Sequence, residues 1–144
     1  MICIIAVLAA VAVGATGVYA QNTQAVALRQ ATMKQYGRAM VVLGKIVKGD
    51  MAFDLSTIQA ALKTIEETSL KAKTVFPETS KIGETNTLPA AFKKKSDLFG
   101  RFDALARDAR AASSAIADEA SFKAEWAKVA VHCVGCHKDY KKPD

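Results

Sequence analysis

Apolar side chains recur along most of this chain at steps of three and four residues, the spacing of one face of an α-helix. One such stripe lies within Thr23–Val47 and a second within Leu55–Val75. A third follows Pro89, and a fourth lies within Glu119–Lys141. Because an apolar stripe needs a partner surface that excludes water, the pattern predicts four amphipathic helices around one core.

Polar residues mark where these helices begin and end. Lys48-Gly49-Asp50 gives the first helix a basic last turn followed by a glycine, a common C-terminal signal. Asp54 and Asp118 are suited to cap the N-termini of the second and fourth helices. Residues 78–88 are polar and aperiodic, which indicates a long loop between Pro77 and the third helix.

Short connections place consecutive helices side by side and antiparallel. We therefore expect an all-α fold, an antiparallel up-down-up-down four-helix bundle. The inner side of its third helix is predicted to consist of Phe92, Ser96, Phe99, Phe102/Asp103, Leu105/Ala106 and Ala109.

Residues 1–20 form an uncharged apolar segment that ends in the small-x-small sequence Val18-Tyr19-Ala20. This predicts a secretory signal peptide over 1–20 and a mature four-helix domain over 21–144, located in the periplasm. No Lys or Arg precedes the apolar run, which departs from the usual pattern. The alternative is an uncleaved anchor, because about 20 apolar residues can span a bilayer.

Charge changes this picture only slightly. The 144 residues carry a formal net charge of +6, and all charged residues follow the apolar segment. A basic surface suits acidic partner proteins or simply solubility. Nothing in the chain resembles a nucleic-acid-binding module, and we expect no membrane association after signal cleavage.

The candidate chemistry lies at Cys133-Val134-Gly135-Cys136-His137, which has the spacing of a c-type haem attachment sequence. Cys133 and Cys136 would each form a thioether bond to a haem vinyl group, and His137 would offer a ring nitrogen to the iron. At i, i+3 and i+4 these three residues share one helix face, the predicted core-facing stripe. The motif thus predicts one covalently attached haem c inside the fold.

Two alternatives to haem use the same cysteines as a thiol pair or as metal ligands. Thioredoxin-like CxxC pairs open a helix after a strand, whereas this pair ends a helix in an all-helical chain. Two cysteines and nearby histidine also leave a zinc site incomplete. The third cysteine, Cys3, lies in the predicted leader, so no disulfide framework is expected.

The second axial position on the iron decides the function, and four residues are chemically suited to it: Met33, Met40, Met51 and His132. In the predicted bundle, Met33 lies within about 9 Å of the level of His137, and Met40 about 10 Å further away. Met51 belongs to the opposite end. His132, adjacent to Cys133, points about 100° off the haem face. Met33 is the best candidate, with ordinary core packing as its alternative role.

The chain resembles class II cytochromes c, the cytochrome c′ family, across nearly the whole predicted mature region. The resemblance rests on CVGCHKDY, on LRQATMKQYGRAMVVLGKIVKGD, on VFPETS and on the Pro89-led helix. Low-spin members of the cytochrome c-556 type carry a ligand methionine where Met33 stands, whereas high-spin cytochromes c′ commonly carry leucine. The resemblance therefore implies iron ligation by His137 and Met33, and it implies that Arg29 binds a haem propionate.

Two positions depart from the family pattern. Lys141 stands where an arginine often follows the aromatic residue after the haem histidine, and Phe92 replaces a tryptophan common early in the third helix. Lysine keeps the charge but lacks the planar guanidinium, which leaves the tuning of that haem edge open.

These observations predict a periplasmic single-electron carrier with a low-spin haem, and not an enzyme. The lysines around the motif would suit acidic redox partner proteins. The alternative is a five-coordinate cytochrome c′ that binds NO or CO. The apolar stripes are compatible with either a monomer or a homodimer.

Overall fold

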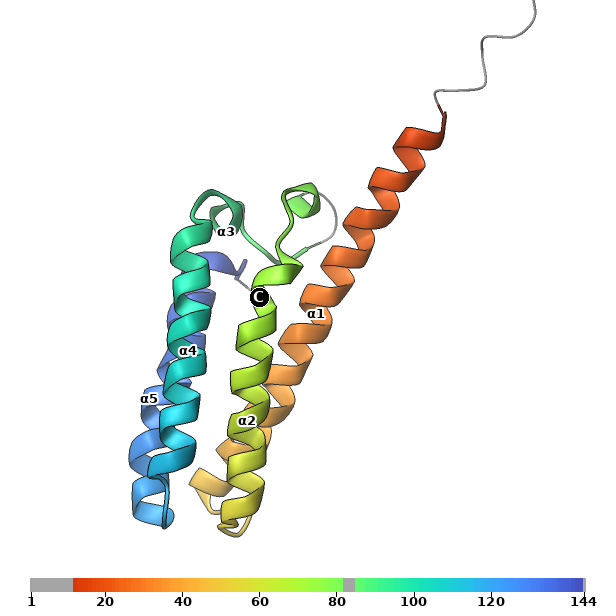
Figure 1. Cartoon of the computed structure of the whole chain (residues 1–144). Helices are drawn as coiled ribbons and strands as arrows, with labels where there is room; N and C mark the ends of the chain where they lie inside the picture. Colours follow the sequence, from red (N-terminus) through yellow and green to blue (C-terminus); the bar gives the residue numbers. More distant parts are fainter. Residues whose placement is uncertain (1–11, 82–84, 144) are drawn as a thin grey trace, which may run out of the picture.

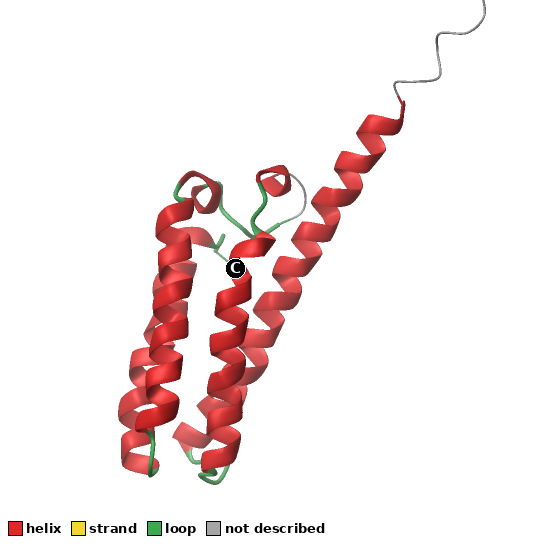
Figure 2. Cartoon of the chain, in the orientation of Figure 1, coloured by secondary structure: helices red, strands yellow, loops and turns green. Residues whose placement is uncertain are grey.

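The computed structural model describes residues 12–81 and 85–143. Four long helices lie side by side in a bundle (Figure 1): α1 (Ala12–Lys48), α2 (Leu55–Ala72), α4 (Lys95–Ala115) and α5 (Glu119–Tyr140). Successive long helices run in opposite directions. Within the described ranges the chain consists of helices and loops (Figure 2), apart from one isolated bridge between Thr87 and Lys141. The predicted up-down-up-down bundle is confirmed.

Helix α1 begins much earlier than the periodicity predicted. It starts at Ala12, and its first turns extend beyond the other helices in Figure 1. The predicted cleavage sequence Val18-Tyr19-Ala20 therefore lies within this helix, while residues 1–11 of the predicted signal fall outside the described part. The division after residue 20 stays a prediction. In the described residues, no helix combines the length and the apolar character that crossing a membrane requires.

The turn between α1 and α2 forms as its residues predict. Gly49 has a φ of 80°, a left-handed conformation that glycine adopts without strain. The Asp50 N–H donates to the Lys45 carbonyl at 2.9 Å, which closes the end of α1. The Asp54 carboxylate then accepts a 2.6 Å hydrogen bond from the Thr57 N–H, which confirms the predicted N-cap.

The segment after α2 contains more structure than predicted. Helix α2 ends at Ala72, and a short 3₁₀ turn, η1 (Lys73–Val75), occupies the rest of the predicted helix. A second turn, η2 (Glu78–Lys81), lies in the predicted long loop. The prediction of a long loop over 78–88 therefore missed the turn at its beginning, and residues 82–84 lie outside the described ranges.

The third predicted helix consists of two helices, α3 (Ala90–Lys93) and α4, which meet at a break on Lys94. Lys94 has φ −117° and ψ 43° at this break. The side chains that follow it therefore point in other directions about the helix axis than they would in one continuous helix. Leu98 is consequently buried, whereas Ser96, predicted to face inward, is exposed. The predicted stripe is right again from Phe102 onward.

The bundle has two ends with different interiors. At the capped end, where α2 and α5 begin, a hydrophobic core includes fully buried Leu43, Ile58, Leu62, Ile65, Phe122 and Val129. At the motif end, where α5 ends, a smaller core consists mainly of Phe76, Phe92, Leu98, Phe102 and Tyr140. Helix α5 connects the two ends. It begins at a capping box in which Asp118 and Ser121 bond reciprocally, which confirms its predicted start.

Candidate haem site

The last turns of α5 carry the cysteines and the histidine of the motif. Cys133 and Cys136 are half-buried free thiols, and His137 is exposed. The stripe that contains them is buried at Phe122 and Val129, half-buried at the two cysteines, exposed at His137 and buried again at Tyr140. The sequence predicted a core-facing stripe over the whole helix, and the structure departs from this prediction at the exposed His137.

Tyr36 on α1 lies beside both thiols. Burial, together with the charges that Cys133 and Cys136 would carry on deprotonation, raises the pKa of Tyr36 to about 12. Its hydroxyl donates to the Ser69 hydroxyl on α2 at 2.9 Å, and Ser69 in turn donates to the Ile65 carbonyl at 2.7 Å. This chain of hydrogen bonds fixes α1 and α2 next to the cysteines.

Met33 lies one turn before Tyr36 on the same side of α1. Its two neighbours on that stripe, Arg29 and Tyr36, are 3% and 8% exposed, whereas Met33 is 36% exposed. Because α1 and α5 are antiparallel and in contact, moving one turn back along α1 corresponds to moving one turn forward along α5. Three residues on α1 and four on α5 are about 4.5 and 6 Å, so Met33 and His137 occupy the same level of the bundle.

The other three ligand candidates lie elsewhere. Met40 packs, partly buried, against the core at the capped end. Met51 lies in the turn after α1 at that same end. His132 points to α4, where its Nε2 is 2.6 Å from Asp108 Oδ2. Of the three methionines, Met33 is therefore the one that lies level with the motif, while His132 is directed toward α4.

Arg29 is buried at the motif end and bonded mainly to the protein. Its guanidinium lies over the rings of Phe76 and Phe92, 5.4 and 5.5 Å from their centroids. Nη1 donates to Val75 O at 3.0 Å and to Ser80 Oγ at 2.6 Å, and Nη2 donates to Ser80 O at 3.0 Å. Nε is buried, and no described residue accepts its hydrogen. The predicted propionate contact would use this remaining N–H.

The chemistry of these donors fits a covalently held haem. Two thiols and an imidazole lie on adjoining turns of one helix face, and a thioether lies at the same level on α1. Burial raises the pKa of both thiols, so each is a neutral S–H near pH 7. In the described residues, no group of three or more His, Cys, Asp or Glu side chains is placed to hold a metal ion.

Several residues of this region could not be found from sequence alone. Tyr36 fitted the apolar stripe, but nothing marked it as a neighbour of the thiols. Ser80 lies in a segment without periodicity, so its contact with Arg29, 51 positions away, left no local signal. Arg101 has an i, i+4 carboxylate partner in Asp97, a visible pair that says nothing about a contact with α5.

Comparison with known proteins defines the class. A family profile described as Cytochrome C′ matches residues 24–141. The chain therefore belongs to the cytochrome c′ family, that is, to class II cytochromes c. Members of this family are non-enzymatic, periplasmic electron-transport proteins with one covalent c-type haem, and the four-helix fold agrees with this assignment.

Individual relatives refine the comparison. The chain is 36% identical over 138 residues to a cytochrome c′ of Rhodopseudomonas palustris, covering 95% of this chain and 94% of the relative. A cytochrome c-556 of Agrobacterium tumefaciens is 30% identical, covering 78% and 93%.

Solved structures also place a cytochrome c′ ahead of a cytochrome c-556 in similarity to this chain. A Rhodopseudomonas palustris cytochrome c′ superposes with a TM-score of 0.80 at 34% identity, over 83% of this chain and 97% of that one. A cytochrome c556 structure from the same organism gives 0.77 at 25% identity, over 85% and 98%. Overall similarity thus favours the cytochrome c′ alternative over the c-556 type expected from the sequence.

Proposed function

We propose that this protein carries single electrons in the periplasm on one haem c, attached through Cys133 and Cys136, with His137 and Met33 as the axial ligands. The observation that carries the proposal is the position of Met33. It stands level with His137, on the α1 stripe that meets the cysteines, and is markedly more exposed than its buried stripe neighbours. Its thioether is thus available to a group held between α1 and α5.

Each residue of the site has a defined role in this proposal. The bound haem supplies reversible one-electron chemistry between ferric and ferrous iron. Cys133 and Cys136 would hold it by two thioether bonds, and His137 would present an imidazole nitrogen to the metal. Met33 would favour the ferrous state, since thioether ligation raises the reduction potential. With His137 and Met33 both bound to the iron, small ligands would be excluded.

The surface near the motif fits an acidic redox partner. Lys34, Lys138 and Lys142 are exposed cations on α1 and at the end of α5. Cations around a redox site attract a partner of opposite charge and accelerate encounter. These cations support electron transfer to an acidic protein. In this proposal the transfer takes place after export and removal of residues 1–20.

A second candidate function is binding of NO or CO at a five-coordinate haem. It is favoured by the overall similarity to a cytochrome c′, which exceeds that to the c-556 relatives. A cytochrome c′ variant of Alcaligenes xylosoxidans has been solved as a nitric oxide complex; at 20% identity it shares only the fold with this chain. In this function Met33 would pack beside the iron without bonding to it.

Identity over the whole chain and the identity of one ligand answer different questions. Coordination depends on whether a single side chain can donate to the metal, and 138 aligned residues average over that position. A leucine has no donor atom, whereas the thioether of Met33 has one. For this reason we propose the electron carrier and retain the gas-binding protein as the second candidate.

Spectra of the purified, haem-loaded protein and of its Met33→Leu variant separate the two functions. As an electron carrier, the wild type has a low-spin ferric spectrum and does not bind CO when reduced. Met33→Leu then becomes high-spin, binds CO and has a lower reduction potential. Met40→Leu is the matched control, because Met40 is on the same helix but packs against the capped-end core.

Other outcomes are equally clear. A high-spin wild type that binds CO, with Met33→Leu unchanged, would support the second candidate instead. Protein purified from a host able to mature c-type cytochromes, yet lacking covalent haem, would contradict both.

A further inference from the structure

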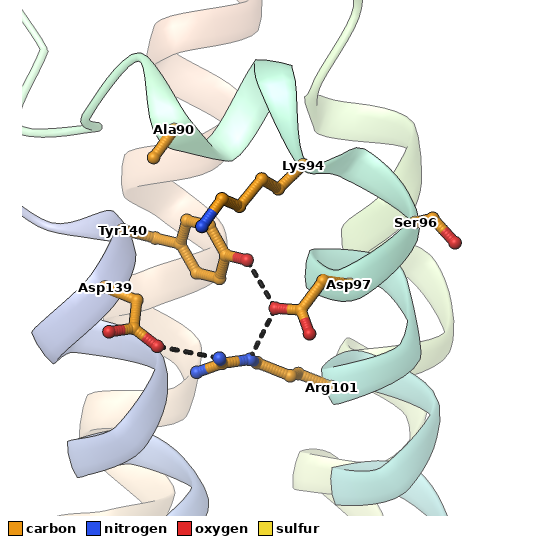
Figure 3. A pocket seen from close by; sticks show the side chains of 7 residues that line it. All are labelled: Ala90, Lys94, Ser96, Asp97, Arg101, Asp139 and Tyr140. Atoms are coloured by element: carbon orange, nitrogen blue, oxygen red, sulfur yellow. Dashed lines mark hydrogen bonds and ion pairs between the residues drawn. The ribbon is translucent and has the colours of Figure 1, made fainter.

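A pocket between α4 and α5 at the motif end contains charged residues that the proposed function does not use (Figure 3). Arg101 extends from α4 toward α5 across this pocket, with Asp97 on its own helix and Asp139 on the facing one. The full lining is Ala90, Lys94, Ser96, Asp97, Arg101, Asp139 and Tyr140.

Arg101 contacts the haem-binding turn of α5 on both sides of Cys136 and His137. Its Nη1 donates to the Gly135 carbonyl at 2.9 Å, and its Nη2 donates to Asp139 Oδ2 at 2.7 Å. Gly135 directly precedes Cys136, and Asp139 is two residues after His137. The side chain of Arg101 is about one third exposed, so these bonds are partly shielded from water.

Other members of the cluster hold Arg101 in this position. Its Nε donates to Asp97 Oδ2 at 2.8 Å, and its guanidinium lies 5.1 Å from the centroid of the Tyr140 ring. The Tyr140 hydroxyl donates to the same Asp97 oxygen. The hydrogen bond from Tyr140 and the charge of Arg101 both lower the pKa of Asp97, which keeps it an anionic acceptor.

The end of a helix needs such support. The last four carbonyls of an α-helix lack partners within the helix, and terminal turns fray. Helix α5 ends at Tyr140, three residues after His137. The Leu88 N–H donates to the Tyr140 carbonyl at 2.9 Å, and this hydrogen bond holds the last residue of the helix in place. Arg101 secures the preceding turn, the one that carries Cys136 and His137.

We propose that Arg101 is a positioning residue for the haem. By its hydrogen bonds to the Gly135 carbonyl and the Asp139 carboxylate, it fixes the orientation in which α5 presents Cys136 and His137. This inference rests on the proposed attachment of haem at this motif, and it holds whether or not Met33 binds the iron. Geometry matters here more than charge. A guanidinium has five N–H groups in a planar fork, whereas the compact ammonium of lysine cannot span three acceptors on two helices.

Three variants of the haem-loaded protein test the role of Arg101. Arg101→Gln removes the guanidinium and its hydrogen bonds to α5, and Arg101→Lys keeps only the positive charge. Arg110→Gln is the matched control. Arg110 is also on α4 and is also paired with a carboxylate, but its Nε donates to Glu66 on α2 at 2.7 Å. The readouts are covalent haem per chain, the reduction potential, and the pH at which acid releases His137 from the iron, followed by the haem spectrum.

We expect Arg101→Gln to contain less haem per chain than wild type, to have a shifted potential and to release His137 at higher pH. Arg101→Lys should show the same changes, and Arg110→Gln none. Asp139→Asn, which weakens one contact and leaves Arg101 in place, should give a smaller shift of the same sign.

Equal potentials and release curves for Arg101→Gln and Arg110→Gln would overturn the inference. Full rescue by Arg101→Lys would also overturn it, by showing that charge alone suffices. A wild type without covalent haem would contradict the proposed function instead, so the two failures are distinguishable.

Discussion

The two halves of α5 have the same periodicity and different surroundings. In the first half, Phe122 and Val129 are 1% and 0% exposed and pack against the other helices. In the second half, Cys133 and Cys136 are half-buried and His137 is exposed, before the stripe is buried again at Tyr140. On α1, Met33 interrupts a buried stripe in the same way, because it is 36% exposed between Arg29 and Tyr36, which are 3% and 8% exposed. An apolar stripe therefore shows which side of a helix is to be covered, but not whether protein or another group covers it.

Loss of the two thiols should give the largest effect. In a Cys133→Ala/Cys136→Ala variant we expect no haem to remain on the chain after denaturation, since no thioether bond can form. Haem staining of a denaturing gel measures this. Amide exchange should accelerate in the last turns of α5 and stay slow around Ile58 and Ile65, which are buried by protein.

The control for that variant lies between the cysteines. Val134 is 72% exposed, so Val134→Ala should retain its haem. Haem that survives denaturation on the double variant would show that the attachment residues are others.

Truncating the core at the capped end should have a large effect of another kind. Phe122→Ala removes a side chain that is 1% exposed and lies 6.3 Å, between ring centroids, from Phe53. Large-to-small changes at such sites cost about 3–5 kcal/mol of unfolding free energy. Chemical denaturation measures the loss, while the haem spectrum should stay as in wild type.

The same helix provides a matched control. Val131→Ala alters a side chain that is 61% exposed, and the expected change is within about 0.5 kcal/mol. A similar loss in both variants would contradict the difference in packing described here.

The smallest effect concerns the cap of α2. Hydrogen bonds from Thr57 and Ser56 lower the pKa of Asp54 to about 2, from an ordinary value near 3.9. Because the folded state prefers the carboxylate, Asp54 stabilises the protein above about pH 4. This stabilisation is lost as the pH falls from about 4 to 2.

Asp54→Ala should lower the melting temperature near pH 7 and change it little at pH 2. Asp54→Ser keeps a neutral N-cap and should retain most of the stability without that pH dependence. Melting curves at both pH values measure the difference, and an equal loss for Asp54→Ala at pH 2 and pH 7 would argue against the cap.

The fold was largely predictable because its determinants are local. Helix periodicity, Gly49 and the caps at Asp54 and Asp118 act within a few residues, and all three form as expected. The break at Lys94 was missed because no proline or glycine marks it. The stripe drawn through Ser96 was therefore placed out of phase with the buried Leu98.

The candidate site was predictable only in part, for a related reason. The spacing of Cys133, Cys136 and His137 is local and chemically specific, so the sequence alone indicates them. Met33 required the antiparallel packing of α1 and α5 to be inferred first. The three bonds of Arg101 join positions as far as 38 residues apart, and no local pattern encodes them.

The break at Lys94 also lets the side chains of α3 and those of α4 point in directions that one continuous helix would not allow. In a continuous helix, Phe92 and Leu98 would point about 120° apart, at about 100° per residue, so they could not both lie at the centre of one inward face. With the break, Phe92 stacks on Arg29 while Arg101 reaches Gly135. Changes on one side of Lys94 can thus adjust the surroundings of Arg29 without rotating Arg101, so that the two sides of the site can vary separately over evolution.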